Sequence, residues 1–193
     1  MGFMRLIGDI DPTRPLLVLA VAEEAAHLNT DLPVLLTGMG KVNAATAVAT
    51  VLARGPRPTG VVNLGTAGAL KPGFGGVTHE VSSVIQHDLD TETLASLTGV
   101  TYGAPIGLTG RGPVLATGDL FVSEEAARAR LAELADLVDM EGYAVAQAVR
   151  QTGLPVRLVK HVSDDAGEGA AQSWRESVEG CAKELGRWVA ESL

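Results

Sequence analysis

The fold is decided by the stretch Gly60-Val61-Val62-Asn63-Leu64-Gly65-Thr66-Ala67-Gly68, a short apolar run followed by small residues. Gly60–Leu64 has the length and apolar character of a buried strand. The small residues 65–68 then predict a loop in which the backbone approaches a ligand closely. In α/β proteins, ligands bind where such loops leave the carboxyl ends of strands. This stretch therefore predicts an α/β fold with a site at one edge of its sheet.

The same pattern recurs along the chain. Other short, largely apolar runs predict strands at Leu16–Ala22, Val34–Thr37, Val77–Gln86, Val114–Thr117 and Val156–Val162. Helices are predicted at Val42–Ala53, at Glu124–Leu134 with Ser123 as its N-cap, at Glu141–Gln151 and at Ser173–Leu193. The alternation predicts a three-layer α/β fold, a central mixed β-sheet flanked by helices. The length predicts one domain over residues 1–193.

Composition excludes several classes of function. The 15 basic and 23 acidic residues give a net charge of −8, which disfavours nucleic acid as a partner. The longest apolar run, Leu16–Ala22, is far shorter than the ~20 residues that span a membrane. The single cysteine, Cys181, excludes an internal disulfide and fits a reducing, cytoplasmic setting. His87-Asp88-Leu89-Asp90 lacks further ligand spacing, so no metal is expected.

Charged and glycine-rich segments follow the predicted strands, where a ligand site is expected. They are Glu23-Glu24, Gly38-Met39-Gly40-Lys41, Gly118-Asp119-Leu120-Phe121 and Ser163-Asp164. Asp164 leaves a buried strand, where a carboxyl group is suited to proton donation. The segments therefore predict acid–base chemistry by carboxylates at one sheet edge.

Purely structural roles stay open for these segments. Gly38–Lys41 matches neither the phosphate-loop nor the dinucleotide pattern and equally fits a glycine turn that opens a helix. Glu23-Glu24 and Glu141 each fit carboxylates that complement a helix dipole, and Asp164 fits an N-cap. The chain also lacks the Gly-x-Ser-x-Gly motif of common α/β hydrolases.

Seven segments in this order resemble the nucleoside phosphorylase and nucleosidase family, most closely its 5′-methylthioadenosine/S-adenosylhomocysteine nucleosidases. They are Ala20-Val21-Ala22-Glu23-Glu24, Gly38-Met39-Gly40-Lys41-Val42, Asn63-Leu64-Gly65-Thr66-Ala67-Gly68, His87-Asp88-Leu89-Asp90, Ala116-Thr117-Gly118-Asp119-Leu120-Phe121-Val122, Met140-Glu141 and Val162-Ser163-Asp164. The resemblance implies a nucleoside phosphorylase-like fold and cleavage of the N-glycosidic bond between purine and ribose. By this resemblance Asp164 would protonate N7 of the purine, Ser163 would orient Asp164, and Glu24 would activate the attacking water.

The resemblance also implies which residues bind the substrate. Glu141 would hold the ribose 2′- and 3′-hydroxyls, and Met140 would pack against the sugar. Phe121 would stack on the base while the backbone of Val122 reads its edge. The other substrate-binding candidates are Met39 and Trp174 in the 5′-substituent pocket, with Thr66, Gly68, Ser163 and Lys160.

Several departures and contrasts sharpen this prediction. Lys160 stands where the nucleosidases usually have an arginine near the water, and Val21 and Thr66 replace a methionine and a serine. Where related phosphorylases carry phosphate-binding arginines, this chain has Glu23-Glu24 and Asn63-Leu64-Gly65, which favours water as the nucleophile. Family members that act on 6-oxopurines typically have an asparagine at the position of Asp164. The aspartate in this chain resembles the family members that act on adenine nucleosides.

We therefore expect a cofactor-free, cytoplasmic homodimer that hydrolyses an adenine nucleoside and takes part in methionine salvage, with a small-molecule purine nucleoside as its partner. The alternatives are a hydrolase of another purine nucleoside of the futalosine type, a purine nucleoside phosphorylase, and a nucleoside-binding protein without turnover. The stretch Thr91–Arg111, which resembles the part that reaches a neighbouring subunit's 5′ pocket, is shorter here than is usual in the family.

Overall fold

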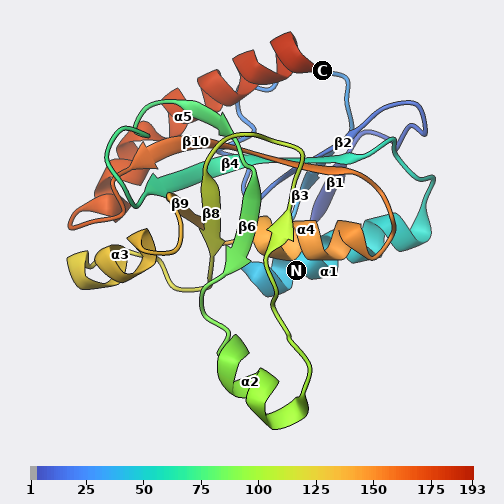
Figure 1. The fold of residues 1–193 in the computed structure, drawn as a ribbon. Helices are drawn as coiled ribbons and strands as arrows, with labels where there is room; N and C mark the ends of the chain where they lie inside the picture. Colours follow the sequence, from blue (N-terminus) through green and yellow to red (C-terminus); the bar gives the residue numbers. More distant parts are fainter. Residues whose placement is uncertain (1–3) are drawn as a thin grey trace.

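The computed structural model describes residues 4–193 and contains ten strands and five helices in them (Figure 1). The strands are β1 (Arg5–Ile7), β2 (Leu16–Leu19), β3 (Val34–Leu36), β4 (Val61–Ala69), β5 (Thr78–Glu80), β6 (Ser83–Gln86), β7 (Ile106–Gly107), β8 (Val114–Thr117), β9 (Leu137–Asp139) and β10 (Val156–Asp164). The helices are α1 (Lys41–Arg54), α2 (Thr91–Thr98), α3 (Glu125–Ala132), α4 (Gly142–Arg150) and α5 (Ala170–Ser192).

The strands form one mixed sheet around β4. The main path is β1-β3-β2-β4-β9-β8-β6-β7, and β10 pairs with β4 and with β5. Strands β2 and β10 run parallel to β4, whereas β9 meets the far end of β4 in the antiparallel direction. Helix α5 covers one face of the sheet, and α1 and α4 cover the other (Figure 1). The predicted three-layer α/β fold is thus confirmed.

Alternation along β4 divides the core between the two faces. Val62 and Leu64 pack with Leu185 of α5, while Val61 packs with Val48 of α1 and Val145 of α4. Because successive side chains of a strand point to opposite faces, a strand buried on both faces is apolar at nearly every position. The carboxyl end of β4 therefore emerges between two helical layers.

The strongest correction concerns the predicted loop at residues 65–68, because β4 continues through it to Ala69 and pairs with β10 as far as Asp164. The glycines here serve close packing within the strand. A Cβ atom on Gly68 would lie 2.9 Å from the Cβ atom of Ala166 and 3.1 Å from Oδ1 of Asp164. Sequence pattern does not distinguish this use of glycine from a turn.

Other boundaries differ because strand partners change along the chain. The predicted strand Val77–Gln86 is two strands, since β5 pairs with β10 and β6 pairs with β8. The predicted strand Leu16–Ala22 ends at Leu19, and the first residue before α3 is Glu124, without a side-chain cap from Ser123. Four short elements, β1, β7, β9 and α2, were not predicted.

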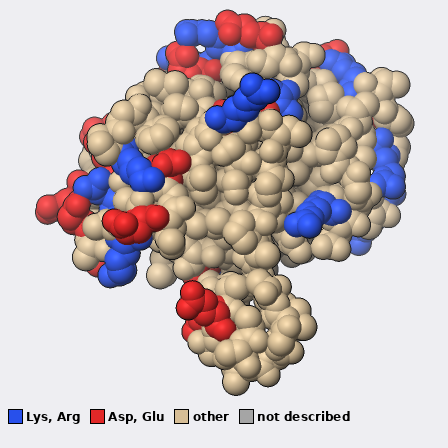
Figure 2. Space-filling model, in the orientation of Figure 1, with Lys and Arg blue, Asp and Glu red and all other residues tan. Residues whose placement is uncertain are grey.

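Helix α2 and its flanking loops project from the body of the sheet (Figure 1). In the same orientation, uncharged side chains cover much of the surface above this projection (Figure 2). Most of the charged side chains in this view lie toward the margins of that surface. Within residues 4–193, no helix combines the length and apolar character needed to cross a membrane.

Candidate active site

A cavity of about 250 Å³ lies where β2, β4, β9 and β10 end. Its lining includes Glu24 and Asp164, the two predicted catalytic residues, and nine of the predicted substrate-binding residues: Met39, Thr66, Gly68, Phe121, Val122, Met140, Glu141, Ser163 and Trp174. Segments more than 100 residues apart in the sequence thus meet in one cavity. Lys160 is the predicted site residue that does not line it.

Glu24 follows β2 and is buried, with 4% of its surface exposed. Its Oε1 atom accepts hydrogen bonds from the backbone N–H and the hydroxyl of Thr66, both at 2.8 Å. Its Oε2 atom is buried and has no hydrogen-bond partner among residues 4–193. A buried carboxylate oxygen without a partner lacks a bond that a water or substrate hydroxyl supplies.

Gly65 makes room for this carboxylate. A Cβ atom at Gly65 would lie 3.3 Å from both Oε1 of Glu24 and the ammonium of Lys160. The missing side chain therefore lets the carboxyl group of Glu24 and the ammonium of Lys160 approach the same point of β4.

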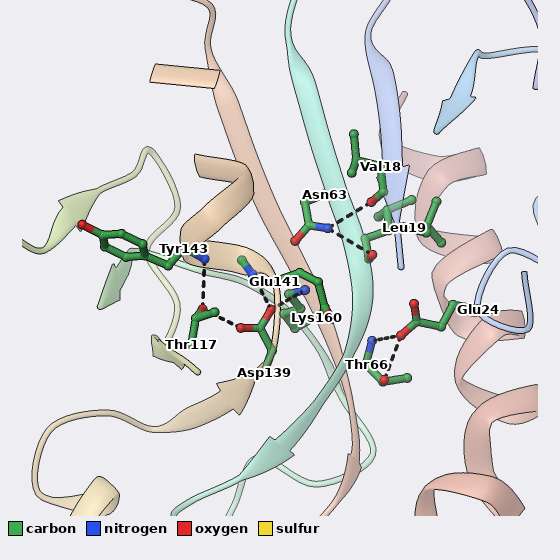
Figure 3. Close-up of polar contacts among 12 residues, drawn as sticks. Val18, Leu19, Glu24, Asn63, Thr66, Thr117, Asp139, Glu141, Tyr143 and Lys160 are labelled. Carbon is green, nitrogen blue, oxygen red and sulfur yellow. Dashed lines mark hydrogen bonds and ion pairs between the residues drawn. The ribbon is translucent and has the colours of Figure 1, made fainter. Parts of the chain in front are cut away.

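Lys160 belongs to a buried polar network that includes Asp139, a residue of the cavity lining (Figure 3). Its ammonium lies 2.8 Å from Oδ2 of Asp139, which also accepts the backbone N–H of Gly142 at 2.8 Å. The hydroxyl of Thr117 donates to the other oxygen of Asp139 at 2.6 Å. Burial alone would lower the pKa of Lys160, but the negative charges of Asp139 and Glu141 outweigh it and raise that pKa. Lys160 therefore stays cationic although only 1% of it is exposed.

Glu141 immediately precedes α4 and is also buried. Its Oε1 atom accepts the backbone N–H of Gly40 at 2.7 Å, which ties the loop before α1 to the start of α4. Burial, followed by the charge of Asp139, raises the pKa of Glu141 to about 8, although Lys160 and the bond from Gly40 oppose the shift. At neutral pH this carboxyl group mostly holds a proton, so it can both donate to and accept from a hydroxyl.

Asp164 ends β10 at an irregularity in its pairing with β4. Its Oδ2 atom accepts the hydroxyl of Ser163 at 2.8 Å, and its Oδ1 atom accepts the backbone N–H of Ala166 at 2.8 Å. These two bonds fix the carboxyl group at the cavity wall. The predicted orienting contact from Ser163 is therefore present in the structure.

The outer part of the cavity is apolar and more exposed. Met39 and Phe121 are each 47% exposed, and Trp174 of α5 donates from its indole N–H to the hydroxyl of Thr66 at 2.9 Å. An aromatic ring beside an apolar wall suits a flat base or an apolar substituent.

The segment His87–Asp90 lies outside the cavity lining. Its Asp88 is engaged in an ion pair with Lys41 and accepts the backbone N–H of Asp119 at 2.9 Å. Among residues 4–193, no three metal-ligating side chains gather in one place. The carboxylate of Asp88 thus links its own loop to the segments that contain Lys41 and Asp119.

Sequence pattern missed Thr117 and Arg175. Thr117 ends a predicted strand, and its place beside Asp139 follows only from the unpredicted pairing of β8 with β9. Arg175 lines the cavity from α5, and a charged residue on a helix carries no signal of what it faces.

The sheet order and the acidic cavity at its strand ends define a nucleoside phosphorylase-like α/β protein. The chain belongs to the phosphorylase superfamily, whose family model matches residues 27–103 and 108–193. The resemblance found in the sequence is thereby confirmed.

Several relatives match most of the chain. A 5′-methylthioadenosine/S-adenosylhomocysteine nucleosidase from Geobacillus kaustophilus is 31% identical over 182 residues, covering 81% of this chain and 77% of that protein. An aminodeoxyfutalosine nucleosidase from Campylobacter jejuni is 28% identical over 181 residues, covering 82% and 79%. A solved structure of a Streptococcus pneumoniae MTA/SAH nucleosidase has a TM-score of 0.78 at 22% identity, covering 92% of this chain and 97% of that chain, and so supports the fold.

Proposed function

We propose that this chain hydrolyses the N-glycosidic bond of adenine nucleosides of the 5′-methylthioadenosine/S-adenosylhomocysteine type, releasing adenine and a ribose derivative. The single observation that carries the proposal is the buried, unpartnered Oε2 atom of Glu24 in the cavity that Asp164 also lines. Hydrolysis of this bond needs a base for water and an acid for the leaving group. The nucleosidase relatives support the same chemistry.

In the proposed reaction, Asp164 in its acid form donates a proton to N7 of adenine as the bond between C1′ and N9 breaks. The bonding electrons leave with the base, and positive charge develops on the ribose. Glu24 accepts a proton from water through its free oxygen while the water oxygen bonds to C1′. The hydrogen bonds from Thr66 hold the other oxygen of Glu24, and so they orient the base without occupying its reactive side.

Other residues would bind the substrate. The carboxyl group of Glu141 would hold the ribose hydroxyls, and Met140 would pack against the sugar. Phe121 would stack on adenine beside the Val122 backbone. The remaining contacts are proposed for Met39 and Trp174 around the 5′ substituent, and for Thr66 and Gly68 along β4.

We assign Lys160 a positioning role. Its ammonium reaches Asp139, which is bonded to the start of α4 beside Glu141. Its positive charge offsets the surrounding carboxylates, which otherwise repel one another. Lys160 thus substitutes for the arginine that is usual in the family without touching the substrate.

Water is proposed as the nucleophile in preference to phosphate. Glu24, which the proposed reaction uses as the base, lines the cavity, and the one basic side chain of the lining within residues 4–193, Arg175, is exposed. A phosphate dianion beside the carboxylate of Glu24 is disfavoured, whereas a neutral water is not. The reaction is acid–base chemistry and calls for no cofactor.

Hydrolysis of an aminodeoxyfutalosine-type nucleoside is the second candidate. The same acid, base and ribose contacts would serve it, and the Campylobacter jejuni relative supports it. The two candidates differ in the 5′ substituent, which meets the outer part of the cavity.

The test is a panel of purine nucleosides incubated with and without phosphate, with the released base and sugar identified by chromatography. We expect adenine and a free ribose derivative at equal rates in both conditions. A sugar phosphate would indicate phosphorolysis. Tight nucleoside binding with no base release would instead support a binding protein.

We also propose that residues 1–193 act as one domain, in a cytoplasmic homodimer with a place in methionine salvage. Exposed apolar side chains near the cavity and on the projecting segment support a self-association surface: Met39, Val42, Leu97, Val100, Tyr102, Leu120 and Phe121. Light scattering on the purified chain tests this, and a monomeric mass at micromolar concentration would contradict it.

A further inference from the structure

The cavity lining contains one basic side chain within residues 4–193, that of Arg175. Arg175 lies in the second turn of α5, and Ala171 and Trp174 line the cavity with it. Residues spaced three and four apart share one face of a helix. This face of α5 is therefore turned toward the cavity.

No residue among 4–193 forms an ion pair or side-chain hydrogen bond with Arg175. The acidic residue one turn later, Glu179, is engaged by Lys183 at 2.9 Å. By contrast, Arg157 pairs with Glu80 at 2.8 Å. The guanidinium of Arg175 thus keeps its donors available.

Arg175 is exposed, as are three apolar side chains that line the same cavity, Met39, Leu120 and Phe121. The acidic side chains Glu24 and Glu141 are buried, whereas Arg175 is exposed. The buried, inner end of the cavity therefore carries acidic side chains, and its exposed end, the mouth, carries one arginine.

We propose that Arg175 determines specificity by pairing with a carboxylate at the far end of the 5′ substituent. This inference rests on the proposed function and adds the substrate class, adenine nucleosides whose 5′ substituent is anionic. A guanidinium binds a carboxylate through two parallel hydrogen bonds. The opposite charges of the two ends orient such a substrate, with its base inward and its carboxylate at the mouth.

The test compares three nucleosides: 5′-methylthioadenosine, which is uncharged at its 5′ end, S-adenosylhomocysteine, which carries a carboxylate and an ammonium, and a 5′-carboxyalkylthio-5′-deoxyadenosine, which carries a carboxylate alone. Arg175→Gln is expected to lower kcat/KM for the carboxylate-only substrate about tenfold, through KM. The value of kcat/KM for S-adenosylhomocysteine is expected to fall less, because the ammonium of this substrate offsets part of its attraction to Arg175. Turnover of 5′-methylthioadenosine is expected to stay unchanged.

Arg175→Glu should widen the difference in kcat/KM between the carboxylate-only substrate and 5′-methylthioadenosine, because the new side chain repels the carboxylate. The matched control is Arg150→Gln, which changes an exposed arginine at the last turn of α4, away from the cavity lining. This control should leave kcat/KM unchanged for all three substrates. The proposal is overturned if Arg175→Gln lowers kcat/KM equally for charged and uncharged substrates. It is also overturned if only kcat/KM for S-adenosylhomocysteine falls.

Failure of the proposed function can be distinguished from failure of the role proposed for Arg175. If no nucleoside releases adenine, that function is wrong, and calorimetry with the same three nucleosides still measures the ratio of affinities. The carboxylate-only nucleoside must then lose about tenfold in affinity in Arg175→Gln. An unchanged ratio overturns the role of Arg175.

Discussion

The inner end and the mouth of the cavity are built on different principles. At the inner end, Glu24, Asp139 and Glu141 are buried and held by hydrogen bonds from the backbone. At the mouth, Met39 and Phe121 are half exposed, and neither side chain is held by a polar contact. The inner end therefore fixes reacting groups in advance, whereas the mouth can accept different substituents at little energetic cost.

The proposed function divides along the same line. Its chemistry uses a few charged groups whose positions are set by strand pairing, and its choice of the 5′ substituent uses exposed side chains that the sheet does not constrain. Changes at the inner end should therefore be far more damaging than changes at the mouth.

The largest expected effect comes from removing the acid or the base. Glu24→Gln or Asp164→Asn should lower kcat by about 10²–10⁴-fold, the usual contribution of a positioned proton-transfer group. Adenine release from 5′-methylthioadenosine measures this. Circular dichroism and thermal unfolding should show that each variant keeps the fold, and near-wild-type turnover in either variant would contradict the assigned role.

A second prediction compares a buried ion pair with an exposed one. Lys160→Met leaves Asp139 buried without its cation and should lower the free energy of unfolding by about 3–5 kcal/mol. The matched control is Lys183→Met, which breaks the surface pair with Glu179 and should leave the free energy of unfolding nearly unchanged. Urea denaturation of both variants measures the difference.

Combining Lys160→Met with Asp139→Asn should restore part of the lost stability, because the isolated buried charge is removed. If the double variant loses the sum of the two single effects, the network does not act as a unit. That result would also weaken the positioning role of Lys160.

The third prediction concerns pH. Glu141 has a pKa of about 8 in the folded chain against 4.5 as its ordinary value, so between these values the folded state binds a proton that the unfolded state has released. The contribution of Glu141 to stability is therefore full below about pH 4.5 and is lost as the pH rises through about 8. Glu141→Gln should flatten this part of the profile of unfolding temperature against pH.

Glu191→Gln is the control for this experiment, because Glu191 is an exposed residue near the end of α5. It should keep the wild-type profile. A profile that falls equally steeply in Glu141→Gln would show that another group causes the loss of stability.

The sequence predicted the candidate site better than it predicted the path of the chain. Glu24 and Asp164 follow β2 and β10, which both run parallel to β4, and parallel strands bring such positions to one edge whatever the exact boundaries. Glu141 follows β9, which runs antiparallel to β4, so only the family resemblance predicted its place in the site. Sequence could not predict that β4 runs through Gly65 and Gly68, because the need for glycine there comes from Lys160 and Ala166, distant in the chain. It also could not distinguish a Lys160 that touches substrate from one that acts through Asp139, since that depends on the unpredicted strand β9 meeting the end of β4, which pairs with β10.

The smallest expected effect comes from the polar link between the two ends of the cavity. Trp174 donates to the hydroxyl of Thr66, and that hydroxyl donates to Glu24. Trp174→Phe keeps an aromatic ring and removes one hydrogen bond within the protein, worth about 0.5–1.5 kcal/mol, so the ring is held less firmly in the cavity and KM should rise by no more than about 2- to 10-fold. The value of kcat should stay unchanged, because the backbone N–H of Thr66 still holds Glu24 at 2.8 Å. Thr66→Ser, which preserves the hydroxyl, should leave both constants unchanged. A fall in kcat in Trp174→Phe would show instead that the mouth controls the base, and the division between the two ends would then be wrong.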